Sequence, residues 1–257
     1  MPQLSITVQG QGPEMVLLHG WGMNAAVWSP LLPGLVNHYR VTCIDLPGHG
    51  GSTALDGNTL PDWLAALAQV APPRAIWVGW SLGGMLALAF ASRYSARVRQ
   101  LVSVAANLRF VADAAWPDAI APAQLREVAS GVVDDPAATL RRFVALQFMG
   151  GAMSREVLRR VQAAVTQPLP DRNALAAGLE LLRLIDNREG LAELEVPLTM
   201  IFGEHDKLVP LSVIAAIRRL DADSDIRVIP GAGHAPFLSH PDAFLKVLRE
   251  SLPSDHG

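Results

Sequence analysis

The feature that most constrains this chain is the pentapeptide Gly79-Trp80-Ser81-Leu82-Gly83, a Gly-x-Ser-x-Gly motif. An apolar run precedes it at residues 75–78, and a helix-forming run follows it at residues 85–91. This context is typical of a nucleophile elbow, in which a strand turns sharply into a helix and holds the serine in a strained backbone conformation. Glycine on either side avoids the clash that a larger side chain would make there. The motif is short and also occurs by chance, so the rest of the chain must support it.

Strand-like and helix-like segments alternate over the first hundred residues. Strands are expected at 5–8, 15–18, 40–44, 75–78 and 99–105, and helices at 24–35, 60–70 and 85–91. The first strand is expected at a sheet edge, in an antiparallel hairpin with the second, because turn-forming residues 10–13 separate the two. The alternation predicts an α/β fold, with a mostly parallel sheet and helices on both of its faces.

The pattern changes after residue 106 and resumes near residue 190. Between these points only helices are expected, at 121–132, 136–148, 154–166 and 172–185. Strands then return at 198–202 and 225–229, with helices at 212–220 and 241–251. We therefore predict one domain whose α/β core, 1–106 and 190–257, carries a helical cap inserted at 107–189.

A serine nucleophile needs a base and a third group that orients the base. In chains with this kind of elbow the acid and the histidine follow the serine in that order. The histidines that fit are His205, His234 and His240, since the others precede Ser81 or lie in polar, surface-like segments. His234 is placed best, in a glycine-containing loop after a strand, whereas His240 resembles a helix-start residue.

The acid predicted by the same logic is Asp206, in the loop after the strand at 198–202. Glu204 in the same loop is the weaker candidate. Asp206 would hold one imidazole nitrogen of His234 as a donor and leave the other free to take the proton of Ser81. Taken singly, each of these residues could be an ordinary loop residue, but all three occur in the required order at strand ends.

The oxyanion that forms when a serine attacks a carbonyl needs main-chain donors that already face it. Two N–H groups are candidates: that of Leu82 at a helix start, and that of Trp21 in the glycine-rich turn 19–22. His19 is interpreted as a structural residue of this turn, and residues 45–52 as a loop that packs under the site.

Composition limits the classes of partner. The chain has 257 residues, half of them apolar, and a formal net charge of -3, which argues against nucleic acid as the main partner. The single cysteine, Cys43, cannot form an internal disulfide; it is expected to be a buried thiol, which suits the cytoplasm. No secretory signal is expected at the N-terminus. The uncharged stretch 75–92 is long enough for a membrane span, but a buried strand followed by a buried helix explains it equally, and no membrane association is expected.

Several segments together resemble the α/β-hydrolase superfamily and, more narrowly, the BioH-type esterases of biotin biosynthesis. The segments that carry the resemblance are 19–24 (HGWGMN), 45–50 (DLPGHG), 77–84 (WVGWSLGG), 142–147 (RFVALQ) and 234–241 (HAPFLSHP). The similarity covers nearly the whole chain, cap included. Enzymes of this family remove the methyl group from pimeloyl-acyl carrier protein methyl ester.

The resemblance implies roles for individual residues. It makes Ser81, Asp206 and His234 catalytic, and it makes Trp21, Leu82, Phe143, Val144, Ala145, Leu146 and Gln147, together with Ser81 and His234, substrate-binding. It implies an acyl carrier protein as partner. A serine mechanism requires no cofactor or metal, in agreement with the lack of a phosphate-binding loop or a His/Cys ligand cluster in the sequence. A monomer is expected.

The cap sequence adds a basic patch to an acidic protein. Between residues 141 and 160 it has five arginines and one acid, Glu156. We expect Arg142, Arg155 and Arg159 to dock an acidic carrier protein, although a solvated helix face would have the same composition. The expected chemistry is ester hydrolysis through an acyl-enzyme. A short-chain carboxylesterase, a carbon–carbon bond hydrolase and a non-catalytic ligand sensor stay open as alternatives.

Overall fold

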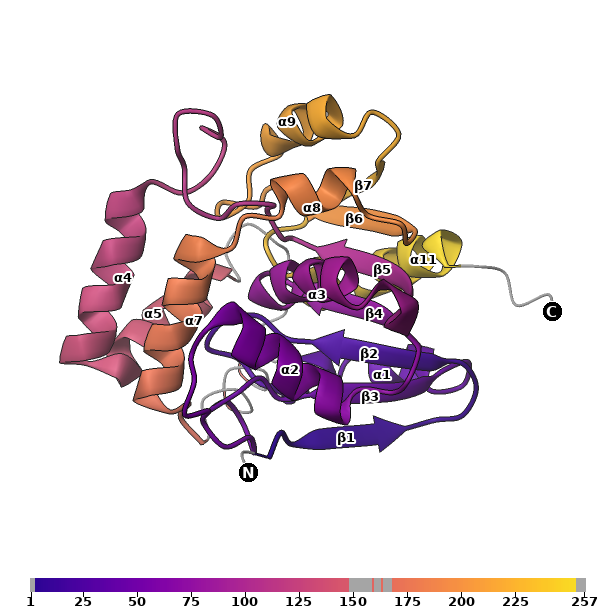
Figure 1. The fold of residues 1–257 in the computed structure, drawn as a ribbon, viewed down its shortest axis with the longest axis horizontal. Coiled ribbons are helices and arrows are strands. Elements are labelled where there is room, and N and C mark those ends of the chain that lie inside the picture. Colours follow the sequence, from indigo (N-terminus) through magenta and orange to yellow (C-terminus); the bar gives the residue numbers. More distant parts are fainter. Residues whose placement is uncertain (1–2, 148–158, 160–162, 164–167, 253–257) are drawn as a thin grey trace.

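The computed structural model describes residues 3–147, 159, 163 and 168–252. At its centre lies a seven-stranded sheet with the strand order β1-β3-β2-β4-β5-β6-β7 (Figure 1). The strands are β1 Ile6–Gln9, β2 Glu14–Leu18, β3 Arg40–Ile44, β4 Ala75–Trp80, β5 Val98–Val104, β6 Leu198–Gly203 and β7 Asp225–Ile229. Neighbouring strands are parallel except for β1 and β3. The predicted α/β fold class is confirmed.

Strand β1 lies at the sheet edge and is antiparallel, as predicted, but the predicted hairpin with β2 is wrong. β1 pairs with β3, with Ile6 opposite Ile44. The connection from β1 to β2 passes close to the segment before β3, where a Cβ on Gly10 would lie 2.3 Å from the carbonyl oxygen of Tyr39. Gly10 takes a φ of +82°, which glycine adopts readily, and this lets the chain cross to the far side of β3.

Two tryptophans of β4 show how both faces of the sheet are covered. Trp77 and Trp80 are three residues apart, so their side chains point to opposite faces. Trp77 stacks on Phe90 of helix α3 (Leu82–Arg93), with ring centroids 4.1 Å apart. Trp80 instead meets Phe237 of helix α10 (Pro236–Ser239) edge to face, with ring centroids 5.2 Å apart. The described α-helices are α1 Leu32–Leu35, α2 Leu60–Val70, α3 Leu82–Arg93, α4 Pro122–Asp134, α5 Pro136–Gln147, α7 Arg172–Leu184, α8 Arg188–Ala192, α9 Val213–Leu220, α10 Pro236–Ser239 and α11 Pro241–Ser251.

The helix predicted at 24–35 is instead two short pieces. A 3-10 helix, Ala25–Trp28, begins at Asn24, whose side chain accepts a hydrogen bond of 3.0 Å from the N–H of Ala26. It is followed by the four-residue helix α1. Pro30 stands between them and has no N–H to donate to a preceding turn, which disfavours one continuous helix. The short helices α8 and α10 were not predicted.

Helices α4, α5 and α7 lie together at the carboxyl ends of the parallel strands (Figure 1). The chain segments that lead into and out of this group run side by side, since the N–H of Asn187 donates to the carbonyl of Leu108 at 2.9 Å. Four charged side chains join the same two segments: Arg109, Asp113, Asp186 and Arg188. The Arg188 guanidinium, 2.6 Å from Asp186, lowers the pKa of that carboxyl.

The helix predicted at 154–166 lies outside the described residues, apart from positions 159 and 163, which are helical.

The uncharged stretch 75–92 is divided between strand β4 and helix α3. Within the described ranges no helix is long and apolar enough to cross a membrane. Cys43 in β3 is a free, buried thiol, as predicted, and burial together with the nearby Asp45 raises its pKa to about 12.

Candidate active site

Ser81 occupies a sharp turn between β4 and α3. Its φ of 55° and ψ of -119° are strained values for a residue with a side chain. The flanking glycines are needed sterically, because a Cβ on Gly79 would lie 2.3 Å from the carbonyl oxygen of Gly83, and one on Gly83 would lie 2.5 Å from that of His19. The conformation expected of a nucleophile elbow is therefore present.

The three side chains selected from the sequence form one hydrogen-bonded chain. His234 Nε2 lies 3.0 Å from Ser81 Oγ, and His234 Nδ1 lies 2.8 Å from Asp206 Oδ2. The other carboxylate oxygen, Oδ1, accepts from the N–H groups of Leu208 and Val209 at 2.8 and 2.9 Å. Asp206 is thereby fixed as an acceptor for Nδ1–H, which leaves the lone pair of Nε2 facing the serine hydroxyl.

The loops that follow β6 and β7 bring Asp206 and His234 together. β6 and β7 are parallel neighbours, so their carboxyl ends meet at the same edge of the sheet. The N–H of His205 donates to the carbonyl of Ala232 at 2.7 Å, which joins the two loops. The weaker acid candidate, Glu204, accepts from the N–H of Gly231 at 2.8 Å, on the same pair of loops.

The other histidines after Ser81 take different positions. His205 is exposed, and His240 is the residue at which α11 begins, as its sequence predicted. The imidazole of His240 pairs with the hydroxyl of Ser239 at 2.9 Å. Among the described residues, Ser81 contacts only one imidazole by a hydrogen bond, that of His234.

The turn 19–22 lies directly against the serine. A Cβ on Gly20 would be 3.2 Å from the Cβ of Ser81, so this main chain passes within contact distance of it. The N–H groups of Trp21 and Leu82 find no acceptor within the described part of the chain. Two unpaired main-chain donors beside a nucleophile are the arrangement that stabilises a developing oxyanion.

Two buried histidines hold this turn in place. His19 Nδ1 donates to the carbonyl of Gly20 at 2.8 Å and its Nε2 accepts from the N–H of Leu46 at 2.9 Å. His49 Nδ1 donates to Pro47 at 2.8 Å and its Nε2 accepts from Gly22 at 3.3 Å. Burial lowers the pKa of His19 to about 3 and that of His49 to about 4, so both are neutral. The predicted structural role of His19 and of the loop 45–52 agrees with these contacts.

The side chain of Trp21 contacts the helices that follow β5. Its Nε1 donates to the main-chain carbonyl of Leu175 in α7 at 2.8 Å. Its ring meets Phe143 of α5 edge to face, with centroids 4.7 Å apart, and packs against Gly178. Phe143 is thus the member of the predicted lining segment that the structure brings to the site turn.

A family model described as "Alpha/beta hydrolase family" matches residues 15–247 of the chain. The chain belongs to the alpha/beta hydrolase family. The curated relatives of this hydrolase include proteins of Shewanella woodyi (42% identity over 252 residues, covering 97% of each chain) and Methylococcus capsulatus (41% identity over 252 residues, covering 98% of this chain and 99% of the relative). Both relatives are named pimeloyl-[acyl-carrier protein] methyl ester esterase.

Solved structures agree on the fold. An esterase from Exiguobacterium antarcticum matches with a TM-score of 0.88 at 20% identity, covering 97% of this hydrolase and 95% of that chain. A bromoperoxidase from Bacillus anthracis matches with a TM-score of 0.87 at 22% identity and the same coverage. At this level of identity the likeness concerns the fold alone.

The remaining residues of the predicted lining segment are divided between the two sides of α5. Val144 and Gln147 are buried with Phe143, whereas Ala145 and Leu146 are exposed. The amide atoms of Gln147 have no hydrogen-bond partner within the described residues. Leu146 and Phe143 line a cavity of about 250 Å³ between α4 and α5 together with Arg142.

Of the predicted docking arginines, Arg142 and Arg159 are exposed, and Arg155 lies outside the described residues.

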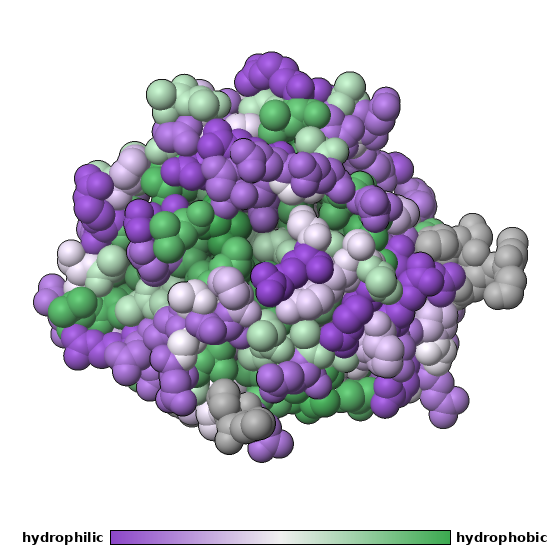
Figure 2. Space-filling model, in the orientation of Figure 1, coloured by the Kyte–Doolittle hydropathy of each residue, from purple (hydrophilic) through white to green (hydrophobic). Residues whose placement is uncertain are grey.

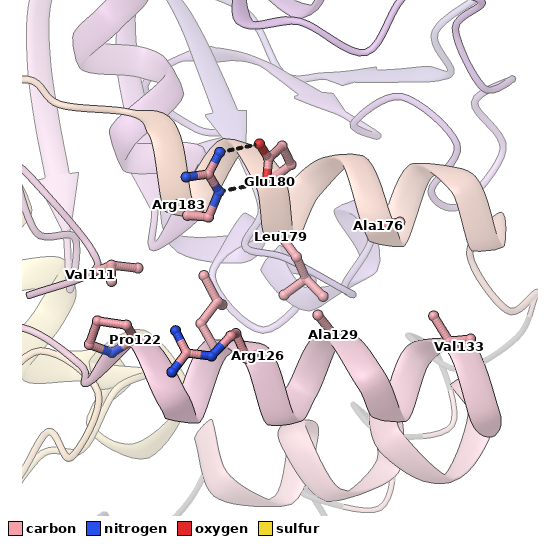
Figure 3. A pocket seen from close by; sticks show the side chains of 10 residues that line it. Val111, Pro122, Arg126, Ala129, Val133, Ala176, Leu179, Glu180 and Arg183 are labelled. Carbon is pink, nitrogen blue, oxygen red and sulfur yellow. Dashed lines mark hydrogen bonds and ion pairs between the residues drawn. The ribbon is translucent and has the colours of Figure 1, made fainter.

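A second cavity of the hydrolase, of about 280 Å³, lies between α4 and α7, where apolar residues gather on the face shown in Figure 2. Leu179 and Ala129 point into this gap, and Arg183 pairs with Glu180 at its rim (Figure 3). None of its lining residues belongs to the site around Ser81. No group of three His, Cys, Asp or Glu residues in the described ranges is placed to hold a metal ion.

Proposed function

We propose that this hydrolase is a serine esterase that cleaves the methyl ester of pimeloyl-acyl carrier protein in biotin biosynthesis. The observation that carries the proposal is the hydrogen-bonded chain Ser81–His234–Asp206, in a protein about 40% identical over nearly its whole length to esterases of that name. Ser81 is the nucleophile, His234 the general base and Asp206 the residue that orients it.

In the first step His234 Nε2 takes the proton of Ser81 while Oγ attacks the ester carbonyl carbon. The carbonyl oxygen gains the negative charge, and the N–H groups of Trp21 and Leu82 stabilise it. The tetrahedral intermediate then collapses, the bond to the methoxy oxygen breaks, and protonated His234 gives its proton to that oxygen. Methanol leaves and the acyl group stays bound to Ser81.

In the second step a water molecule replaces the alcohol. His234 takes a proton from the water, and the resulting hydroxide attacks the acyl carbon. When this second intermediate collapses, Ser81 Oγ is the leaving group and recovers its proton from His234. The product is a free carboxylic acid, and the enzyme returns to its initial state. The two carboxylate oxygens of Asp206 stay occupied throughout, one by His234 and one by main-chain N–H groups.

Residues 107–189 act in this proposal as the cap that selects the substrate. Trp21, Leu82 and the segment 143–147 line the acyl site, with Phe143 in contact with the Trp21 ring. Arg142, Arg155 and Arg159 receive the acidic carrier protein. The support for docking is the positive charge and exposure of Arg142 and Arg159 on a protein of net negative charge.

The proposal places the reaction in the cytoplasm and assigns it to a monomer. The support is that the site is built from one chain and that the single cysteine, Cys43, is a buried thiol. No cofactor takes part in the proposed steps, and the net charge of -3 agrees with a protein partner rather than nucleic acid.

The experiment compares wild type and Ser81→Ala on two substrates, pimeloyl-acyl carrier protein methyl ester and p-nitrophenyl butyrate. We expect wild type to release one methanol for each carboxylate that it forms on the carrier-bound substrate, with both products measured by mass spectrometry. Ser81→Ala should release no methanol. The wild-type gene should also restore growth to a biotin auxotroph that lacks its own esterase, whereas Ser81→Ala should not. Turnover of the small ester alone would identify a general carboxylesterase, and turnover of neither would favour a ligand-binding protein.

A further inference from the structure

The residue before the serine, Trp80, is wholly buried and lies between the two loops that complete the site. It ends β4, and its exposed fraction is 0%. Its side chain points to the face of the sheet opposite α3, where it meets Phe237 of α10. None of the roles assigned so far uses this side chain.

One edge of the Trp80 indole holds the loop of His234. Nε1 donates a hydrogen bond of 2.8 Å to the main-chain carbonyl of His234, and the indole and imidazole ring centroids are 5.7 Å apart. His234 is 1% exposed, and no other donor to this carbonyl occurs within the described residues. The hydrogen bond therefore fixes the main chain of the residue whose imidazole faces Ser81.

The six-membered ring of the same indole supports the opposite side of the site. A Cβ on Gly20 would lie 3.2 Å from Cε3 of Trp80, at the same distance as from the Cβ of Ser81. The turn that presents the Trp21 N–H therefore rests on the Trp80 ring. One rigid side chain thus contacts both the loop of the base and the turn of the oxyanion donor.

This pairing is not a general consequence of burying tryptophan in this protein. Trp28, Trp63 and Trp77 are also wholly buried, and their Nε1 atoms have no hydrogen-bond partner within the described residues. Trp77 stands in the same strand as Trp80 and stacks on Phe90 on the other face of the sheet. It provides a matched control of the same residue type.

We propose that Trp80 is a positioning residue for the reaction at Ser81, which sets the distance between His234 and the serine and the place of the Gly20–Trp21 turn. This inference rests on the proposed ester hydrolysis but not on the identity of the ester. Displacing reacting groups by about 1 Å costs on the order of 100-fold in rate, so a support of this kind acts on the chemical step.

The test measures kcat and KM for p-nitrophenyl butyrate in wild type, Trp80→Phe and Trp77→Phe, together with the thermal unfolding of each. The rate at which diethyl p-nitrophenyl phosphate inactivates each protein reports the attack of Ser81 without the later deacylation. A further protein has 3-benzothienylalanine in place of Trp80, where a sulfur replaces the indole N–H and the ring shape is kept. This protein decides the question if Trp80→Phe does not fold.

We expect Trp80→Phe to lose about 10- to 100-fold in kcat and in inactivation rate, with KM within about twofold of wild type. Trp77→Phe should lose comparable thermal stability but keep its kcat. The benzothienylalanine protein should lose about tenfold in kcat. A wild-type kcat in either altered Trp80 protein, or an equal loss in Trp77→Phe, would overturn the positioning role. Absence of turnover in wild type would instead refute the proposed function, and with it this role.

Discussion

The indole nitrogen of Trp21 donates a hydrogen bond of 2.8 Å to the main-chain carbonyl of Leu175, 154 residues later in the chain. Trp21 belongs to the turn that lies against Ser81, and Leu175 belongs to α7 in the helical segment after β5. One side chain therefore joins the reaction site to the helices proposed to select the substrate. A shift of α7 would displace the main chain of Trp21 through this hydrogen bond.

Trp21→Phe should remove this hydrogen bond while keeping an aromatic ring next to Phe143. We expect the free energy of unfolding to fall by about 1 kcal/mol. We also expect kcat for p-nitrophenyl butyrate to fall several-fold, because the proposed oxyanion donor, the Trp21 N–H, is held less firmly. Trp116→Phe is the control, since Trp116 also donates a buried hydrogen bond, to Asn107 at 2.9 Å, within the helical segment. Equal kcat values in the two variants would show that the Trp21 contact serves stability alone.

Asp206→Asn should inactivate the enzyme without unfolding it. The carbonyl oxygen of Asn can still accept from Leu208 and Val209, but its NH2 group then faces His234 Nδ1. The histidine must present a lone pair there and an N–H toward Ser81, which is the wrong tautomer for a base. We expect kcat to fall about 10⁴-fold, with the far-ultraviolet circular dichroism unchanged.

The matched control for this prediction is Glu204→Gln, since Glu204 was the other acid candidate in the same loop. Its side chain accepts from the N–H of Gly231, and the amide oxygen of Gln can do the same. We expect kcat near the wild-type value. A large loss in Glu204→Gln with an active Asp206→Asn would move the orienting role to Glu204.

Most elements of this fold could be predicted from local sequence patterns, because the apolar residues that become buried and the residues that form turns lie within short segments. The predicted bounds of α2, β7 and α11 agree with the structure, and each of these is framed by capping or turn residues. The pairing of β1 with β3 was missed, since which strand a chain pairs with depends on contacts far away in sequence. The prediction of one helix at 24–35 was wrong, because the chain there forms two short helices with Pro30 between them.

The site shows the same contrast between residues that local sequence patterns predict and contacts between residues far apart in the chain. Chain order and strand-end loops predicted that Ser81, Asp206 and His234 would meet, and the structure brings these three together. The hydrogen bond from Trp80 to the His234 carbonyl joins residues 154 positions apart and depends on the direction of one side chain, which no local pattern encodes. The only sequence signal was a large aromatic residue directly before the serine.

Protonation of His19 and His49 should destabilise the fold in mild acid. The pKa of each falls from 6.5 to about 3 and about 4, so above pH 6.5 neither state of the protein is protonated there and the stability is complete. As the pH falls from 6.5 toward 4, only the unfolded state takes up these protons, and stability is lost at up to about 1.4 kcal/mol per pH unit for each histidine. Urea unfolding of His49→Gln between pH 7 and 5 should show a shallower decline than wild type. His38→Gln, at an exposed position, should follow wild type, and identical slopes in all three would refute the role of the buried pair.

Gly79→Ala should prevent stable folding of the elbow. The new Cβ would lie 2.3 Å from the carbonyl oxygen of Gly83, a main-chain atom that cannot move aside. Overpacking of this kind costs about 1–3 kcal/mol or more, so we expect a clear drop in the melting temperature and loss of activity. Gly34→Ala is the control, because its Cβ would meet the flexible end of Leu245 at 2.6 Å. It should lose less stability and stay active; a larger loss than in Gly79→Ala would contradict the steric argument.

Removal of the exposed arginines at 142 and 159 should weaken the use of a carrier-bound ester without affecting a free one. An exposed ion pair is worth about 0.2–1 kcal/mol, so Arg142→Ala combined with Arg159→Ala should raise KM for pimeloyl-acyl carrier protein methyl ester several-fold and leave KM for p-nitrophenyl butyrate unchanged. The difference should shrink as salt is added, because screening weakens the attraction in wild type as well. Arg126→Ala is the control for net charge, since Arg126 is exposed on α4 and lines the cavity beside α7. The single variants Arg142→Ala and Arg159→Ala are measured beside it. If Arg126→Ala raised KM for the carrier-bound ester as much as each of them, the effect would be one of overall charge, and Arg142 and Arg159 would not form a docking surface.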